Sequence, residues 1–208
     1  MEQIDLFVKC KFSNLQLEAM KQIYYKYFAP HLNQPYLGKA FVAIWEEDGK
    51  WEPGKGNDKN HSNNGFVSND CRFDPLWNEF SNLLPYMSKS ASITKMHSGS
   101  VMLPHVDRKW RPHAIYFPIE GCSELCVSEY YELPKENTQN NQVRKEFSKS
   151  VYSYSVNDNA YLTNVHEWHG VKNLSLVERI TVGWNFKNSR MSFKECREIL
   201  GDLGYLDD

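Results

Sequence analysis

A succession of short strand-like runs through the second half of the chain constrains the fold more than any other feature of the sequence. Each run is rich in β-branched, aromatic or aliphatic residues, and turn residues such as Ser98-Gly99 and Glu120-Gly121 separate the runs. The runs cover residues 92–96, 100–103, 113–118, 124–128, 151–156, 160–163 and 180–186. Many short strands, with helical patterns only before and after them, favour an α+β chain with two packed antiparallel sheets. We therefore predict a jelly-roll core, a double-stranded β-helix, over residues 91–187.

The N-terminal part is predicted to supply supporting helices. Ser13 can cap a helix over residues 13–28, because apolar side chains recur in this segment at roughly helical spacing. These side chains are Leu15, Met20, Ile23 and Tyr27. Asp74-Pro75 predicts a second helix start, with Asp as the cap and Pro at the first helical position.

Three further segments complete the predicted organisation. A β-branched and aromatic run over residues 40–45 predicts a strand. Residues 46–69 are rich in Gly, Asn, Asp and Lys and show no periodicity, which predicts a long mobile loop at the rim of a site. Near the end of the chain, Ser192 and Glu195 have the spacing of a capping box for a last helix to about Leu203.

Length and composition are typical of a globular protein. With 208 residues, 41% of them hydrophobic, we expect one domain over residues 1–208, comprising an N-terminal part (1–90), the core (91–187) and a C-terminal helix (188–208). A formal net charge of -2 without a basic run argues against a nucleic-acid partner. No apolar stretch approaches about 18 residues, so no membrane partner is expected. Five cysteines without a CxxC pair favour reduced thiols in a cytoplasmic protein.

Residues of the types that bind metals lie within the predicted core, as His105-Val106-Asp107 and His169. Two imidazoles and one carboxylate can occupy one face of Fe(II) and leave three positions open for substrate and oxygen. A His-x-Asp pair alone is more often a surface pair than a site, so the interpretation depends on the whole set. Arg179 follows His169 by ten residues, which suits a cationic anchor on the next strand. The set predicts an oxygenase that uses iron and a dicarboxylate co-substrate.

Strand parity predicts the surroundings of Arg179. Along residues 179–186, polar or small side chains alternate with apolar ones, so the two kinds lie on opposite faces. The polar face carries Arg179, Thr181, Gly183 and Asn185. We expect the apolar face to pack in the core and the polar face to line a ligand cavity. The same parity places Arg111 and His113 together on one face of the neighbouring run.

These residues resemble those of the Fe(II)/2-oxoglutarate-dependent dioxygenases, which have a cupin-like fold. Within them the chain looks most like the aspartyl/asparaginyl β-hydroxylase group. Residues 94–105 are similar to that group's strand leading into the first iron histidine, and residues 111–113 to its Arg-x-His. The spacing from His169 to Arg179 matches its distal-His-to-Arg spacing. Asp107 stands where some members of the group have Gly, so this chain looks like the commoner full triad.

The resemblance implies a role for each of these residues. His105, Asp107 and His169 would hold Fe(II), and Arg179 would bind the far carboxylate of the co-substrate 2-oxoglutarate. Further contacts with 2-oxoglutarate are implied for Thr181, Arg111, His113 and Thr94. With O2, such a site hydroxylates a C–H bond of a peptide side chain or an amino acid and releases succinate and CO2. The nucleic-acid demethylase branch has a second Arg on the last strand, which this chain lacks.

Three alternatives stay open from the sequence. His166 competes with His169 as the distal ligand, although His169 has the group's spacing to Arg179. A jelly-roll protein without catalysis could bind a metal or a small molecule through the same ligands, but Arg179 then has no evident task. In a structural or interaction module, the triad would be a coincidence.

Overall fold

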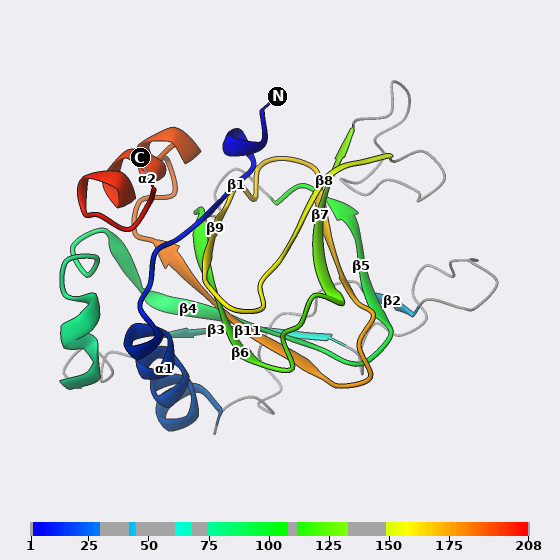
Figure 1. Cartoon of the computed structure of the whole chain (residues 1–208), viewed down its shortest axis with the longest axis horizontal. Helices are drawn as coiled ribbons and strands as arrows, with labels where there is room; N and C mark the ends of the chain where they lie inside the picture. The colour runs from blue at the N-terminus through cyan, green and yellow to red at the C-terminus, as the bar shows by residue number, and fades with distance from the viewer. Residues whose placement is uncertain are drawn as a thin grey trace.

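The computed structural model describes residues 2–29, 42–44, 61–67, 75–107, 112–132 and 149–207. Two antiparallel sheets face each other, and the helices lie on the far side of one of them (Figure 1). The larger sheet has the strand order β1-β9-β6-β11-β4-β3, and the smaller sheet has the order β2-β5-β10-β7-β8. The strands are β1 (Phe7–Lys9), β2 (Val42–Ile44), β3 (His61–Val67), β4 (Met87–Met96), β5 (Ser100–His105), β6 (Ala114–Glu120), β7 (Cys126–Glu132), β8 (Lys149–Ser155), β9 (Tyr161–Thr163), β10 (His169–Asn173) and β11 (Arg179–Phe186).

The chain from β4 to β11 crosses repeatedly between the two sheets. Strands β4, β6, β9 and β11 belong to the larger sheet, and β5, β7, β8 and β10 belong to the smaller one. Eight antiparallel strands wound in this way form a jelly roll. The predicted α+β class with a double-stranded β-helix core is therefore confirmed. Strands β1, β2 and β3 extend the sheets at their edges.

The predicted strands all appear, with shifted ends, whereas β1, β3 and β10 were not predicted. His169 lies between the predicted strands 160–163 and 180–186, and it is the first residue of β10. The sequence of β10, His-Gly-Val-Lys-Asn, has weak intrinsic strand propensity, but β10 pairs with β5 on one side and β7 on the other. Pairing on both sides outweighs local preference in a central strand.

Helix α1 (Asn14–Ile23) begins where the sequence predicts. The Ser13 hydroxyl accepts a hydrogen bond from the Gln16 amide at 3.2 Å, and the Gln16 side chain accepts one from the Ser13 amide at 2.8 Å. This reciprocal pair is a capping box. Leu15, expected in the apolar stripe, is 67% exposed, and α1 gives way to a π-helical turn over Tyr24–Phe28.

The apolar face of β11 packs in the main core, as predicted. Its side chains meet those of the helices on the outer face of the larger sheet, away from the smaller sheet. Among the buried members of this core are Ile180, Val182, Trp184, Phe186, Met20, Ile23, Trp77, Phe80, Phe193 and Leu200. The last two belong to α2 (Phe193–Asp202), which starts with the predicted Ser192–Glu195 capping box.

The two remaining N-terminal predictions have different outcomes. The predicted helix start at Pro75 is present, but the element is a short 3-10 helix, Pro75–Phe80, which buries Trp77 and Phe80. Within the predicted loop 46–69, His61–Val67 form the edge strand β3, which pairs along the length of β4. An edge strand needs a partner on one side only, so a polar run of low β-propensity can serve. The other residues of that loop lie outside the described ones.

Two further sequence expectations concern the cysteines and membrane-spanning helices. The cysteines of the described part, Cys10, Cys122, Cys126 and Cys196, are free thiols, as expected. No helix in the described residues is long and apolar enough to cross a membrane.

Gly121 occupies a position that no other residue can fill without displacing the backbone. It has a positive φ of 59°, and a Cβ there would overlap the backbone carbonyl of Glu178. We expect Gly121→Ala to lower the free energy of unfolding by about 3 kcal/mol, from left-handed strain plus overpacking. Urea unfolding measures this loss.

Gly99 provides the matched control. Its φ is 71°, but a Cβ there would meet no atom within 4 Å. Gly99→Ala should therefore cost only the strain, about 1 kcal/mol. Equal losses in the two variants would show that the contact between Gly121 and Glu178 does not matter.

Candidate functional site

The structure brings His105, Asp107 and His169 together. His105 ends β5 and His169 begins β10, and the two residues are directly opposite each other in the antiparallel pairing of these strands. Their rings lie 4.4 Å apart between centroids. Asp107 follows β5, and its amide donates to the Val165 carbonyl at 3.0 Å, which ties the turn to the segment before β10. One potential ligand atom from each of the three residues lies within 4.8 Å of the others.

A bulge in β5 lies opposite Gly170, next to both histidines, because two residues of β5 between Met102 and His105 face this one residue of β10. The register with β5 shifts between His169 and Val171. Gly170 makes this possible, since a Cβ there would lie 2.8 Å from the Met102 carbonyl oxygen. β-Bulges commonly redirect side chains next to functional sites.

The hydrogen bond of His169 leaves one ring nitrogen suited to a metal. Its Nδ1 lies 2.8 Å from the Glu167 carbonyl oxygen. A carbonyl can only accept, so Nδ1 carries the proton and donates it. Nε2 then keeps its lone pair, the arrangement found in metal-binding histidines whose second nitrogen is held by a backbone carbonyl.

The donor set fits a divalent metal. His105 Nε2 lies 3.8 Å from Asp107 Oδ1, and both side chains are partly buried, at 20% and 11% exposure. Two atoms bound at about 2.1 Å to one ion lie at most about 4.2 Å apart, so the cluster needs only a small contraction. Two imidazoles and one carboxylate on one side of the ion suit Fe(II) in particular. The residues present therefore fit an iron site.

Arg179 is buried on the inner face of the larger sheet with its charge poorly compensated. It is 3% exposed, and its Nη1 contacts the Met96 sulfur at 3.7 Å, a weak acceptor. Its Nε has no hydrogen-bond partner. Among the residues the structure describes, no carboxylate forms an ion pair with it. A buried guanidinium without an anion is costly in free energy, and an anionic ligand would compensate its charge.

The polar face predicted around Arg179 is present and lies between the sheets. Thr181 pairs with Thr94 across β11 and β4, and both are buried, at 1% and 7% exposure. From the sequence, contacts of these two hydroxyls with 2-oxoglutarate were implied by the family resemblance alone. Ser128 and Tyr154, two buried hydroxyl-bearing residues of the smaller sheet, were not singled out from the sequence. Tyr154 is hydrogen-bonded to the Thr163 hydroxyl at 2.7 Å, and the nearby Arg179 charge partly opposes the rise in its pKa that burial causes.

His113 lies on the opposite side of the larger sheet from Arg179. Its ring contacts given by the structure are with His166, at 4.4 Å between centroids, and Phe193 of α2, at 5.5 Å. Parity did group His113 with Ile115 and Phe117, but their common face is the helix-covered core. Burial, and then the His166 charge, lower the pKa of His113 to about 4.

Two further predicted positions, Arg111 and His166, do not join the cluster of possible ligands that the structure describes. Arg111 lies outside the described residues. His166 lies beside His113 and does not belong to the cluster of possible ligands, which contains His169. The described residues contain no other group of three or more His, Cys, Asp or Glu side chains that could hold a metal.

Comparisons with known proteins give distant similarities of fold. No protein-family model and no curated protein matches the chain. Among solved structures, it is similar to the non-heme alpha ketoglutarate dependent carbocyclase SnoK from nogalamycin biosynthesis, with 13% identity, a TM-score of 0.46 and coverage of 86% of this chain and 78% of that one. A Pseudomonas putida prolyl-4-hydroxylase gives 11% identity, a TM-score of 0.41 and coverage of 84% and 86%.

The chain is also similar in fold to a solved structure whose name is not that of an enzyme. Vicilin from Corylus avellana (hazelnut) gives 10% identity and a TM-score of 0.38, over 64% of this chain. The chain spans 31% of the vicilin chain, about a third of its length. At these scores the similarities carry no argument about activity, and the strand topology itself defines the fold.

The cluster should bind divalent metal through the three residues named. Titration of the chelator-treated protein with Fe(II) without oxygen, followed by calorimetry, should show one site. His105→Ala and His169→Ala should each weaken it by at least about 100-fold, because a ligand is lost, and Asp107→Ala should weaken it through loss of the anionic ligand. His166→Ala is the control and should bind as the wild type does. Loss of binding in His166→Ala alone would move the distal ligand to that residue.

His113 should make stability fall in mild acid. Its pKa is about 4 in the folded protein, against about 6.5 for an unperturbed histidine. The unfolded chain therefore takes up the proton first, and stability is lost as the pH falls from 6.5 towards 4, by about 3 kcal/mol in all. In His113→Phe, urea unfolding in the presence of chelator should show a smaller difference between pH 6.5 and 4.5. An unchanged pH dependence would mean that other groups cause the loss.

Proposed function

We propose that this protein is an Fe(II)- and 2-oxoglutarate-dependent dioxygenase that hydroxylates a C–H bond of a peptide or protein side chain or an amino acid. The observation that carries the proposal is the pairing of two sites inside one jelly roll. One is a His-Asp-His cluster on the smaller sheet, and the other is a buried arginine without a carboxylate partner among the described residues. A metal site alone explains the first and leaves the second without a task.

The cluster and the arginine belong to opposite sheets and face the same interior. His169 shares a face of the smaller sheet with Tyr130, its partner on β7. The Tyr130 hydroxyl donates to the Leu6 carbonyl at 2.6 Å, which fixes the tyrosine ring beside His169. Arg179 projects from the inner face of the other sheet. A ligand with one end at the metal and an anionic far end would join the two sites.

Each residue has a distinct part in this proposal. His105, Asp107 and His169 hold the iron and leave one side of it open. Arg179 binds the far carboxylate of 2-oxoglutarate through its planar, two-pronged group of N–H donors. The Thr181 and Thr94 hydroxyls are placed to donate to the same carboxylate.

The cofactor supplies the oxidation itself. When bound, Fe(II) with 2-oxoglutarate and O2 converts 2-oxoglutarate to succinate and CO2 and adds one oxygen atom to the substrate. The chain orients the co-substrate between Arg179 and the metal, and its two sheets shield that co-substrate from water.

Turnover is the direct test. The purified protein with Fe(II), 2-oxoglutarate and O2 should form succinate, and addition of chelator should abolish it. A mass-spectrometric screen of peptides and amino acids for the gain of one oxygen atom identifies the substrate. Folded His105→Ala or His169→Ala protein that still forms succinate at the wild-type rate would show that the cluster is not the site of turnover. Wild-type protein that binds Fe(II) but forms no succinate would favour a binding protein.

Arg179→Ala should separate co-substrate binding from metal binding. Loss of a desolvated two-pronged ion pair costs about 3 kcal/mol, so the KM for 2-oxoglutarate should rise by about 100-fold. The affinity for Fe(II) should stay within about twofold, since Arg179 does not belong to the ligand cluster.

Arg179→Lys is the matched variant for that experiment. It keeps the charge and loses the planar fork, so it should restore only part of the affinity for 2-oxoglutarate. An unchanged KM in Arg179→Ala would exclude the arginine as the carboxylate anchor.

A further inference from the structure

A buried amide side chain joins the strand that carries His169 to the strand that carries Arg179. Asn173 is the last residue of β10, four residues after His169, and it is fully buried. Residues 174–178 then cross from the smaller sheet to the larger, where β11 begins at Arg179. The geometry of this connection fixes where Arg179 stands relative to the metal ligands.

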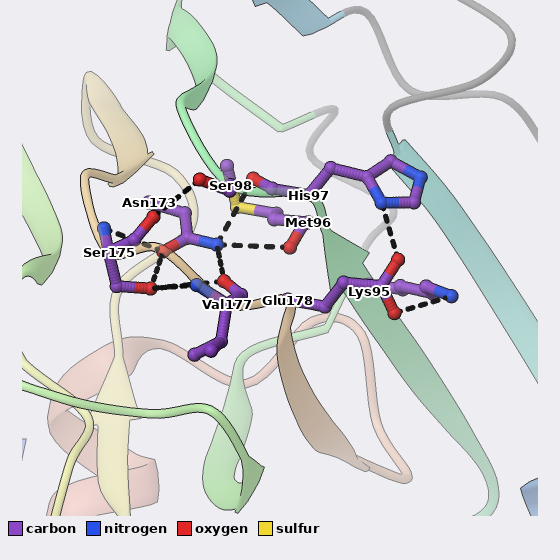
Figure 2. A network of polar contacts seen from close by, with 8 residues as sticks. All are labelled: Lys95, Met96, His97, Ser98, Asn173, Ser175, Val177 and Glu178. Atoms are coloured by element: carbon purple, nitrogen blue, oxygen red, sulfur yellow. Dashed lines mark hydrogen bonds and ion pairs between the residues drawn. The ribbon is translucent and has the colours of Figure 1, made fainter.

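The amide nitrogen of Asn173 faces three backbone carbonyls (Figure 2). Its Nδ2 donates to the Met96 oxygen at 3.1 Å, the His97 oxygen at 3.1 Å and the Val177 oxygen at 2.9 Å. An amide has two N–H groups, so three acceptors share them. One side chain thus ties together the end of β10, the connection to β11 and the turn between β4 and β5.

The amide oxygen of Asn173 is occupied as well. It accepts hydrogen bonds from the Ser175 hydroxyl at 2.7 Å, the Ser175 amide at 3.2 Å and the Cys126 thiol at 3.2 Å. The Ser175 hydroxyl also lies 3.0 Å from the Val177 oxygen, and the Ser98 hydroxyl donates to the Ser175 carbonyl at 2.7 Å. Figure 2 shows Ser98, Asn173, Ser175 and Val177 joined in this network.

These bonds hold the backbone at two positions close to Arg179, Val177 and Met96. Val177 precedes Arg179 by two residues along the chain, and Met96 is its cross-strand partner on β4. The Arg179 guanidinium has few strong bonds of its own, since its Nε is unpartnered, its Nη1 contacts the Met96 sulfur and its side chain also contacts the Cys122 thiol. Both sulfur atoms are weak hydrogen-bond partners. Its position therefore depends on its backbone, and its backbone depends on the network of Asn173.

A second set of contacts holds the same connection from outside. Glu178 pairs with Lys95 at 2.8 Å and with His97 Nδ1 at 2.5 Å. These side chains are 30% to 44% exposed, so the pairs contribute little. Bonds from a buried amide are stronger in effect, because breaking them leaves several buried groups without partners.

We propose that Asn173 is a positioning residue that sets the place of Arg179, and with it the affinity for the far carboxylate of the co-substrate. The proposal rests on the function proposed above. It adds a residue that touches neither metal nor co-substrate and that acts through the backbone on either side of Arg179.

Asn173→Asp is the sharpest variant. It keeps the size and the acceptor but removes both N–H donors, and it sets a carboxylate against three carbonyl oxygens. Glu178→Gln is the matched control, because it weakens the outer ion pairs on the same connection and leaves the amide untouched. Ser175→Ala is a milder second variant that removes one hydroxyl from the network and keeps Asn173.

The first measurement needs no metal and no turnover. Hydrogen exchange followed by mass spectrometry should show the segment 174–180 exchanging at least about tenfold faster in Asn173→Asp than in the wild type. Ser175→Ala should change in the same direction by a smaller factor. Glu178→Gln should exchange as the wild type does. Unchanged exchange in both Asn173→Asp and Ser175→Ala would overturn the proposal.

The second measurement is the affinity for 2-oxoglutarate, by calorimetry on Mn(II)-loaded protein without oxygen. Asn173→Asp should weaken it by about tenfold, as small displacements of a binding group do, and should leave Mn(II) affinity within about twofold. Combined with Arg179→Ala, Asn173→Asp should have no further effect, since it acts through Arg179. Equal loss of both affinities, or an undiminished effect beside Arg179→Ala, would show general loosening instead.

The two proposals fail in different ways. If the wild type binds no 2-oxoglutarate, the proposed function fails, and hydrogen exchange alone decides whether Asn173 holds the backbone at Arg179. If the wild type binds 2-oxoglutarate and Asn173→Asp binds it equally well, the function stands and the positioning role is wrong.

Discussion

The antiparallel pairing of β10 with β5 is the constraint on which the rest of the site depends. It sets His169 opposite His105 and so brings together possible metal ligands that are far apart in the sequence. The pairing is irregular at that point, since Gly170 lets the two backbones approach closely and the register shifts. A regular ladder with a larger residue at 170 would separate the strands where the imidazoles must converge. The cluster of His105, Asp107 and His169 is thus a consequence of strand packing as much as of side-chain type.

The larger sheet divides two kinds of burial between its faces. Its outer face carries the apolar core under the helices, which supplies the free energy of folding. Its inner face carries buried polar groups, among them Arg179, Thr181 and Thr94, which cost free energy when the site is empty. Because β11 alternates strictly, one strand serves both purposes. The stable outer face allows the inner face to hold a poorly compensated charge for a ligand.

Strand parity could be read from the sequence because it is local, and the ligand cluster could be inferred from the residue types and from the spacing between His169 and Arg179. The alternation in β11 predicted its two faces correctly, and the His-x-Asp pair with a distant His predicted the cluster of His105, Asp107 and His169. For His113, parity grouped the residues of its face correctly. The local sequence does not show, however, which face of a strand points into the interior between the two sheets. The structure sets that residue against Phe193 of α2, on the helix side.

What the sequence missed depends on partners distant along the chain. Strand β10 is weak in propensity and exists because of β5 and β7, and β3 exists because of β4. Asn173 follows His-Gly-Val-Lys, and nothing in this local sequence marks it as important. Its importance appears only when the carbonyls of Met96 and Val177, from separate segments, are seen around its amide.

The network of Asn173 also explains how a poorly compensated arginine can keep a defined position. A buried charge usually takes its place from its own ion pairs and hydrogen bonds, which restrict its rotamers. In the proposed function Arg179 keeps those groups available for a ligand, so its position has to be set by other residues. The structure supplies it through the backbone: Asn173 and Ser175 hold the chain before Arg179, and Gly121 allows that chain to pack closely against the turn after β6. In the proposed function, Asn173, Ser175 and Gly121 fix the backbone, and Arg179 binds the anion. The guanidinium can then accept an anion while β11 keeps a defined position.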